Sequence, residues 1–517
     1  MRGLSPTATL SLLLFACAAP PGGASVGTPD AGGQSPDAGG SPAAALSVSP
    51  QARTVLAGAG PVQFTATLSG SPRPITWTLA GPGTLDASSG STTSYTPPRT
   101  IDAATTATVT VTASAGTALV AAATVTILPA STTIDVAGRV VGIPGNGLAG
   151  VTVAIGTLTA VTDADGRFSI PDVTPPYDLA LVAPGSPPMA GLYQGLTRPD
   201  PTLVLLFFLA PGEPHTGVVS GRVFGGDPIP SDGEFTGVVF SSPEATGLLT
   251  LTSRDYTLPL AWFGPETTFG TVYMLRWKSP GPGRPPTEYV SFASTTAVRV
   301  TDDQTSDGSL QPFDAGTASI SGEVVAPAGV TLISKSLSLE FSDHALFPLG
   351  SDQNAETRFN FVVPDHITLT AVVTAIAEFP SGAATFRRQS GIARGANDVA
   401  VVLPTPALQS TPADGSTGVS ASTEFRWSPL EGGVHLVVFN GPGTKPSFYV
   451  VTGESGTRIP DLSTLGAALP PASPYSWFVV GIAPFGSVDD YTGTGFLIPP
   501  VGSLDESISD IRRFTTR

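Results

Sequence analysis

Cysteine, charged residues and long apolar runs are all scarce in this chain of 517 residues. Cysteine occurs once, so the chain can form no internal disulfide and its domains must be stable through their hydrophobic cores alone. Charged residues make up 12% of the sequence, against roughly 25% in typical soluble proteins. The net charge is −16 and no cluster of Lys and Arg occurs. Because phosphates are bound by such clusters, this composition argues against nucleic acid as a partner.

Apolar runs long enough to cross a membrane as a helix are also missing after the first residues. A transmembrane helix needs about 20 consecutive apolar residues. The longest later run, Leu203 to Ala210, is much shorter and favours a buried strand. Hydrophobic residues still make up 41% of the chain, with 59 Gly and 52 Pro. These values indicate several small domains whose surfaces consist largely of Ser, Thr, Gly and Pro.

The single cysteine, Cys17, follows a short apolar run from Ala8 to Ala16, which itself follows a positively charged N-terminus. This order is typical of a signal peptide, and Leu14-Phe15-Ala16-Cys17 resembles the lipobox of bacterial lipoproteins. The resemblance implies a signal peptide at 1–16, cleaved before Cys17, and lipid on the thiol and on the new amino group. Two or more acyl chains hold a protein stably on a membrane. We therefore expect a lipid-anchored protein of the cell envelope. The alternatives are an ordinary secretory leader with an incidental cysteine and a buried free thiol.

The residue after the cysteine is Ala18, whereas an Asp there resembles the inner-membrane retention signal of this family, so the outer membrane is favoured. Residues 17–45 then contain almost no large apolar side chains and repeat Pro-Asp-Ala-Gly-Gly at Pro29 and Pro36. Such a segment cannot bury enough surface to offset its conformational entropy. It predicts a disordered tether between the anchor and the first folded domain.

From Leu46 onward, apolar residues alternate with Ser, Thr and Gln, as in Val62–Leu68 and Ile75–Leu79. A period of two indicates strands with one buried face, and clusters of Gly, Pro, Asp and Ser separate them at short intervals. No amphipathic helix is evident. The pattern predicts an all-β chain of tandem β-sandwich domains. Residues 46–129 resemble a bacterial immunoglobulin-like domain, in which Trp77 is predicted to lie in the core.

The middle of the chain repeats one pattern three times. The opening strands start at Val136, Val219 and Ile320, with Gly-Arg-Val, Gly-Arg-Val and Gly-Glu-Val two residues later. Each copy has a later Phe- or Tyr-containing strand, and Thr202–Phe208, Ala297–Val300 and Asp398–Leu403 are predicted as closing strands. Self-similarity of this kind indicates three copies of one domain, at 130–212, 213–315 and 316–405.

The first copy contains Thr162-Asp-Ala-Asp-Gly-Arg-Phe168 and resembles the carboxypeptidase regulatory-like family, a small transthyretin-like sandwich. The resemblance implies a scaffold that accompanies other functions without being catalytic itself. The second and third copies keep the opening and lose the Asp-Gly hairpin, so they are diverged copies. Asp163 and Asp165 superficially resemble half of a calcium loop but lack the remaining acidic positions, and a hairpin turn is the simpler interpretation.

Residues 406–517 resemble a fibronectin type III domain. The strand Phe425-Arg-Trp427 is followed by a tyrosine-corner spacing at Tyr475, whose phenol is expected to bond to upstream backbone. Phe514-Thr-Thr is predicted as the last strand. About 25 residues, 481–507, replace what is usually a short hairpin, and a connection of that length is either functional or disordered.

Signatures of catalysis are missing. From Leu46 onward, no Gly-x-Ser-x-Gly elbow, His-Glu-x-x-His helix, Gly-x-x-x-x-Gly-Lys phosphate loop or zinc spacing occurs. The histidines stand in unrelated contexts; they are His215, His344, His366 and His435. Acidic groups at Asp302-Asp303 with Asp307, and at Asp489-Asp490, are interpreted as solvated turns, with Ca²⁺ as the alternative. We expect no enzyme activity, no cofactor and no metal.

Aromatic residues provide the remaining candidate for function, because exposed aromatic rings stack on sugars or anchor protein partners. The candidate surface comprises Trp262, Phe263, Trp277, Tyr491 and Phe496. We therefore expect a membrane-anchored display, adhesion or scaffold protein that binds an envelope protein or glycan. Two alternatives are a surface hydrolase with an unrecognised site in the middle copies and a purely structural spacer.

Overall fold

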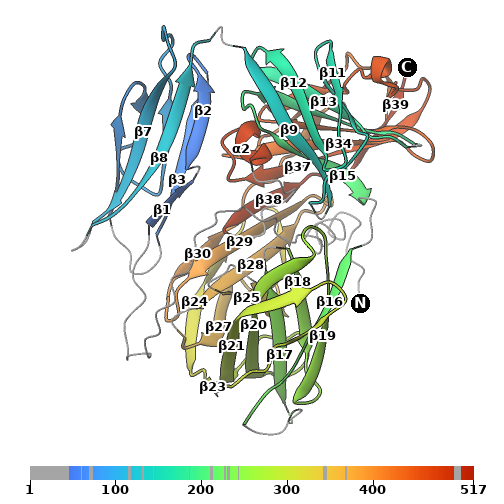
Figure 1. Cartoon of the computed structure of the whole chain (residues 1–517). Coiled ribbons are helices and arrows are strands. Elements are labelled where there is room, and N and C mark those ends of the chain that lie inside the picture. The colour runs from blue at the N-terminus through green and yellow to red at the C-terminus, as the bar shows by residue number, and fades with distance from the viewer. Residues whose placement is uncertain are drawn as a thin grey trace.

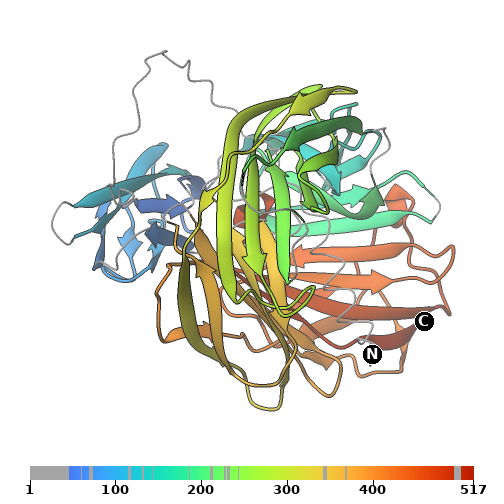
Figure 2. The same ribbon diagram turned by 90° about the horizontal axis from the view of Figure 1, so that it is seen from below.

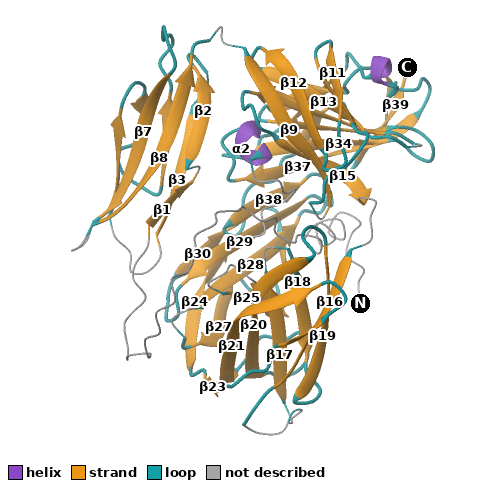
Figure 3. Cartoon of the chain, in the orientation of Figure 1, coloured by secondary structure: helices purple, strands orange, loops and turns teal. Residues whose placement is uncertain are grey.

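The computed structural model describes residues 46–517 except 50, 60, 69–73, 115–117, 131–132, 144, 186, 210–213, 226–228, 230–232, 243, 342–345, 367–368 and 494–501. Strands dominate it, with two short helices among the described residues, η1 (Ser463–Leu465) and α2 (Val488–Thr492) (Figures 1 and 3). The prediction of an all-β chain of tandem sandwiches is confirmed. The predicted signal peptide 1–16, Cys17, the tether 17–45 and Phe496 lie outside the described residues. Within those residues, no helix is both long and apolar enough to cross a membrane.

The N-terminal sandwich is built from two four-stranded sheets, drawn in blue in Figure 1. One contains β1 (Leu46–Ser49), β3 (Val62–Leu68), β6 (Thr92–Thr96) and β5 (Thr84–Leu85), and the other contains β2 (Ala52–Leu56), β8 (Leu119–Leu128), β7 (Thr105–Ala113) and β4 (Ile75–Ala80). Trp77 lies in the core between them and is 3% exposed. Its indole N–H donates to the Gly90 carbonyl at 2.8 Å. The prediction that Trp77 is a core residue is confirmed.

Each of the three copies forms the same three-stranded sheet. The opening strand lies in the centre, antiparallel to the second strand and parallel to the closing strand. In chain order, the three sheets consist of β9 (Ile134–Ile143), β12 (Arg167–Val173) and β15 (Thr202–Leu209); β16 (His215–Arg222), β19 (Asp255–Trp262) and β22 (Thr305–Asp307); β24 (Thr317–Val325), β27 (Arg358–Pro364) and β30 (Val399–Val402).

The glycine shared by the three openings has a steric role. A Cβ on Gly138 would lie 2.5 Å from the Pro201 carbonyl oxygen, and one on Gly322 would lie 2.0 Å from that of Val399. Both oxygens belong to the start of the closing strand, so a larger residue would push that strand away. The common motif is therefore explained by how closely the closing strand passes over the central one.

The predicted closing strand of the second copy is wrong. Ala297–Val300 lies inside a long strand, β21 (Glu288–Thr301), which pairs with β20 (Thr267–Lys278). Val298 and Val300 are buried there in the core of this copy, which explains why an apolar run marks the segment. The strand that pairs with β16 is the short, polar β22, whose composition gives no strand signal.

The second sheets of these domains are larger. In the second copy the sheet order is β18 (Thr246–Thr250), β17 (Glu234–Ser241), β20, β21 and β23 (Phe313–Asp314). The first copy contributes β11 (Leu158–Val161), β10 (Thr152–Ile155), β13 (Tyr177–Val182) and β14 (Met189–Leu196). The third contributes β29 (Ala384–Ile392), β28 (Thr370–Glu378), β25 (Thr331–Glu340) and β26 (Leu346–Asp352).

The C-terminal part, from residue 406, also forms a sandwich. A small sheet holds β31 (Gln409–Thr411), β33 (Glu424–Trp427) and β36 (Gly456–Arg458). The other holds β35 (Ser447–Thr452), β34 (Val434–Asn440), β37 (Pro474–Ala483), β38 (Leu504–Ile508), β39 (Arg512–Thr516) and β32 (Ser416–Val419). Phe514 lies in the last strand as predicted. The Tyr475 phenol donates to the upstream carbonyl of Pro446 at 2.9 Å.

One continuous sheet of 14 strands joins the first copy, the C-terminal sandwich and the third copy. At one junction β14 pairs in parallel with β35, and at the other β29 pairs antiparallel with β38. Figure 2 shows the orange and red C-terminal strands running side by side with those of the first copy. The last part of the chain is therefore placed in space between two earlier parts.

Hydrophobic cores are shared in the same way. One core combines residues of the first copy with Leu436, Phe478 and Ile508 of the C-terminal sandwich and Phe386 of the third copy. Another joins the second copy to the third, where Tyr273 stacks on Phe341 with ring centroids 4.0 Å apart. Backbone pairing and apolar packing across these boundaries make residues 133–517 one block, since domains that merely touch bury smaller and more polar interfaces.

Candidate functional site: a polar pocket between two sandwiches

The predicted aromatic binding surface is wrong for three of its five residues. Trp262, Trp277 and Tyr491 are 2%, 7% and 3% exposed, respectively. Trp277 packs edge-on against Phe347 of the third copy, with ring centroids 5.6 Å apart. All three rings point into cores because they occupy the inward positions of their elements. Phe263 is half-buried and Phe496 lies outside the described residues, so these five residues do not form the predicted exposed surface.

The described histidines lie in three different sandwiches. His215 bonds through Nδ1 to Asp302 at 2.8 Å and through Nε2 to the Gly264 carbonyl at 3.2 Å, and the bond to Asp302 raises its pKa. His435 is buried, which lowers its pKa to about 4, and its Nε2 accepts from the Leu430 N–H at 2.9 Å. Burial also lowers the pKa of His366, which packs against Phe292. Each imidazole ring therefore contributes to the packing or hydrogen bonding of its own sandwich.

The carboxylates considered as calcium ligands accept hydrogen bonds from other groups of the protein. Asp163 accepts the backbone N–H groups of Asp165 and Arg167 at 2.9 and 2.8 Å, which is the geometry of a hairpin turn. Asp302 holds His215, and Asp307 accepts from Ser309. Throughout the described part of the chain, no group of three His, Cys, Asp or Glu is arranged to hold a metal ion.

Asp489 and Asp490 lie on α2, in the long connection between β37 and β38, and bind an arginine rather than a cation from solution. Arg53 of the N-terminal sandwich places its guanidinium 3.0 Å from Asp489 and 3.3 Å from Asp490. Asp489 also accepts the backbone N–H of Thr197, in the first copy, at 2.9 Å. Burial raises the pKa of Asp490, and the Arg53 charge opposes this. The long connection therefore joins three sandwiches.

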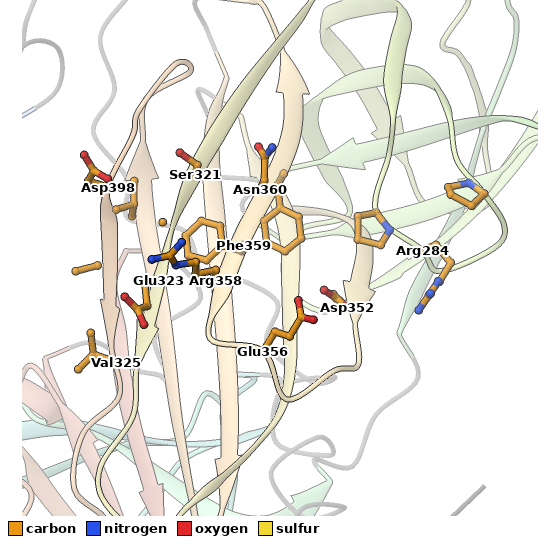
Figure 4. A pocket seen from close by; sticks show the side chains of 16 residues that line it. Arg284, Ser321, Glu323, Val325, Asp352, Glu356, Arg358, Phe359, Asn360 and Asp398 are labelled. Atoms are coloured by element: carbon orange, nitrogen blue, oxygen red, sulfur yellow. The ribbon is translucent and has the colours of Figure 1, made fainter.

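A polar pocket of about 880 Å³ lies between the second and third copies (Figure 4); we call it the intercopy pocket. Its floor is the outer face of the third copy's small sheet, where Glu323 of β24 and Arg358 of β27 are directly paired in register. One wall is the β20–β21 turn with Arg284. Asp352 and Glu356, at either end of the turn after β26, line the pocket between that wall and the floor (Figure 4).

The wall formed by the β20–β21 turn is held firmly in place. The Ser279 hydroxyl donates to the carbonyls of Gly281 and Arg284 at 2.8 and 3.0 Å. The Gly283 carbonyl of the same turn accepts a hydrogen bond from the Ser351 N–H at 2.9 Å. Gly350 lies so close beneath it that a Cβ there would come within 2.4 Å of the Arg284 backbone. The pocket is thus preformed by contacts between the two copies.

Charges of both signs line the intercopy pocket. Within the described part of the chain, the side chains of Arg284 and Arg358 form no ion pair or hydrogen bond, so both guanidinium groups are available to a ligand. Four carboxylates stand around them, together with the polar side chains of Ser321 and Asn360; the carboxylates are those of Glu323, Asp352, Glu356 and Asp398. Such a lining offers fixed donors and acceptors for a hydroxyl-rich or zwitterionic ligand.

Sequence reasoning missed this pocket. Arg358 and Glu323 both lie within the repeated motifs, and their period-two positions place them on the outer face of the sheet. That signal was present, but an outer face becomes a pocket only when another copy packs beside it. Nothing in the alternation of either copy indicates that packing.

Comparisons with known proteins give no close relative. No protein-family model matches the chain, and no curated protein matches it. Among solved structures, the Bacillus anthracis TIE protein aligns over 71% of this chain and 75% of its own, with 9% identity and a TM-score of 0.14. The extracellular domain of protocadherin GammaB4 aligns over 92% and 84%, with 10% identity and a TM-score of 0.15. A tetra-tandem repeat from the extending region of a large adhesion protein aligns over 92% and 100%, with 11% identity and a TM-score of 0.14. Scores this low carry no argument about function.

Proposed function

We propose that this chain is a lipid-anchored lipoprotein of the cell envelope that displays a rigid block of β-sandwiches and binds a partner without catalysing a reaction. The observation that carries the proposal is the continuous sheet with its shared cores. A block of this kind fixes the direction in which a binding site faces. A purely structural spacer needs only to span a distance, and independent domains joined by linkers would do so.

The proposal keeps the expected organisation along the chain. A signal peptide at 1–16 and lipid at Cys17 would place the protein in the outer membrane, with 17–45 as a tether. An immunoglobulin-like domain would cover 46–129, carboxypeptidase regulatory-like copies 130–405, and a fibronectin type III-like domain 406–517. The non-catalytic part of the proposal is supported by the described histidines, which lie in three different sandwiches and contact other residues of the protein there.

The intercopy pocket is the proposed binding site, and a glycan is the ligand class that its chemistry favours. Sugar hydroxyls both donate and accept hydrogen bonds, and the pocket offers free arginines beside carboxylates to meet them. Protein partners are the second outcome of the test. The net excess of carboxylates over arginines in the lining disfavours a strongly acidic ligand.

A full-length Cys17→Ser chain, freed of lipid, would be tested on glycan arrays and in pull-downs from the cell envelope. We expect binding that Arg358→Ala weakens about tenfold or more, because a hydrogen bond to a charged group is lost. Arg99→Ala, at an exposed position in the N-terminal sandwich, is the control and should bind normally. The absence of binding both on the glycan arrays and in the pull-downs would overturn the binding proposal.

Anchoring has its own test. The wild-type chain should fractionate with membranes, and mass spectrometry of its N-terminus should find a diacylated or triacylated Cys17. The Cys17→Ser chain should leave the membrane fraction. An unmodified Cys17 in mature wild-type protein would contradict the anchor while leaving the binding proposal intact.

A further inference from the structure

Lys335 in β25 is completely buried, at 0% exposure, which is rare for lysine because its charge must then be satisfied inside the protein. Its position on β25 is on the inward side shared with Leu337 and Leu339. The ammonium end lies against the turn that follows β26. There Nζ donates to the Asn354 Oδ1 at 2.7 Å and to the Glu356 carbonyl.

The groups around Nζ form more than a set of hydrogen bonds. The Asn354 carboxamide also accepts the Glu356 backbone N–H on Oδ1, at 3.1 Å, and donates from Nδ2 to the Asp352 carboxylate at 2.9 Å. The same Asp352 oxygen lies 3.8 Å from Lys335 Nζ. The Lys335 ammonium, the Asn354 carbonyl that accepts from it and a carboxylate that is bonded to the amide nitrogen therefore lie together, with the carboxylate also near the ammonium.

We propose that Lys335 and Asn354 react to form an intramolecular amide crosslink between their side chains. The Nζ–Cγ bond forms and the Cγ–Nδ2 bond breaks. Two protons leave the Lys335 ammonium in turn and pass through Asp352 to the departing Nδ2. Loss of the first leaves Nζ as a neutral amine that can attack, so that ammonium and carboxamide give a secondary amide and an ammonium ion. No oxidant, reductant or cofactor is needed.

Each neighbour has a defined part in this step. Asp352 is the general acid–base, because it contacts the leaving nitrogen and lies next to the attacking one. The Glu356 N–H donates to the oxygen on which negative charge develops. The surrounding protein holds amine and amide together, which replaces a bimolecular encounter by a local reaction. Asn354 and Asp352 are only half-buried, so ammonia has a route to solvent.

Other lysines lack this arrangement. Lys278 pairs with Glu288 on the surface at 3.0 Å, and Lys445 donates to the Ser473 hydroxyl at 2.6 Å. Neither has a carboxamide as its bonded partner. Lys335 is thus distinguished by complete burial and by the chemical nature of the group that it touches.

Trypsin digestion of the purified full-length wild-type protein tests the proposal. Arg299, Lys335 and Arg358 are successive cleavage sites, and trypsin does not cut after an acylated lysine. We expect one looped peptide, Val300–Arg358, lighter than its sequence mass by one ammonia, about 17 Da. Recovery of Val300–Lys335 and Ser336–Arg358 as separate peptides would overturn the proposal. Loss of ammonia in a released Ser336–Arg358 peptide would also overturn it, because that marks a succinimide at Asn354.

Variants separate the chemistry from folding. Asn354→Ala should abolish the looped peptide and restore cleavage after Lys335. Asp352→Asn should slow its formation about 100-fold or more, as expected for loss of a general acid–base. Asn397→Ala is the matched control, since its carboxamide accepts from Ser321 on the surface of the same copy, and it should keep the looped peptide. Cleavage after Lys278 serves as the internal control in every digest.

Discussion

Glu506 in β38 is an ionisable group placed where its charge is strongly disfavoured. It is 1% exposed, and neither of its carboxylate oxygens has a hydrogen-bond partner among the described residues. It lies between Ile482 and Phe386 in the sheet register, at the junction of the C-terminal sandwich and the third copy. Burial raises its pKa from 4.5 to about 8, and the positive charge of Arg388 opposes this only in part.

The sign of the pH dependence follows from this shift. In the unfolded chain the carboxyl loses its proton near pH 4.5, whereas in the fold it keeps the proton until about pH 8. Its contribution to stability is therefore complete below pH 4.5 and is lost as the pH rises through about 8. A difference of about 3.5 pKa units corresponds to about 5 kcal/mol across that window, of which about 3 kcal/mol is lost by pH 7.

Glu506→Gln removes the charge and keeps the shape. We expect equal stability of variant and wild type at pH 4 and a growing advantage for the variant above pH 5. At pH 7 the unfolding temperature should rise by roughly 6 °C, at roughly 2 °C for each kcal/mol. Differential scanning calorimetry from pH 4 to pH 8.5 measures this for the transition of the joined sandwiches, since a single global free energy is not defined for several domains. Glu431→Gln, on an exposed residue, is the control. Parallel curves for wild type and Glu506→Gln would refute the reasoning.

Two further predictions concern the junctions between sandwiches. Arg53→Ala leaves Asp489 and Asp490 without their buried cation, and loss of one partner of a buried pair costs about 3–5 kcal/mol. The N-terminal sandwich should therefore detach from the block and increase the radius of gyration measured by small-angle scattering. An unchanged radius of gyration would contradict the role of Arg53 in holding the N-terminal sandwich. Gly191→Ala places a Cβ 2.2 Å from the Tyr449 ring across the parallel β14–β35 junction. The unfolding temperature should therefore fall by an amount equivalent to about 1–3 kcal/mol. An unchanged unfolding temperature would show that the two strands can move apart enough to accept the methyl group.

Features set by local pattern could be predicted from the sequence. Trp77 alternates with Ile75 and Leu79, which fixed its inward direction. The openings at Gly138 and Gly322 indicated a repeated unit, and the structure gives their glycines a common steric cause. The same alternation was present for Trp262, which follows apolar residues at every second position of β19. That period indicates a core position for Trp262 as well.

Features that depend on which surfaces meet could not be predicted. β14 and β35 pair because Gly191 leaves room for Tyr449, and residues more than 250 positions apart give no local sign of such a match. The intercopy pocket has the same origin, since its floor and its wall come from different copies. In the sequence Arg53 has the properties of an ordinary surface residue, because nothing near it indicates that α2 packs beside it and pairs with its charge.

The proposed crosslink has a mechanical consequence at the edge of the shared sheet. β26 is an edge strand that pairs only with β25, and an edge strand is held by one ladder of hydrogen bonds. A bond from Lys335 to Asn354 would tie β25 to the turn leaving β26 and close a loop of about 20 residues, which stabilises by roughly 3 kcal/mol through the unfolded chain.

Because the bond would lie at the end of β26, that strand could not peel away from β25 without opening the whole loop. Asn354→Ala should therefore increase amide hydrogen exchange in β26 by about 100-fold, measured by mass spectrometry. β11, the edge strand at the other end of the same sheet, has no such bond nearby and should exchange equally in both proteins. A matching rise in β11 would mean that the variant loosens the sheet as a whole, and unchanged exchange in β26 would mean that pairing with β25 alone holds the edge.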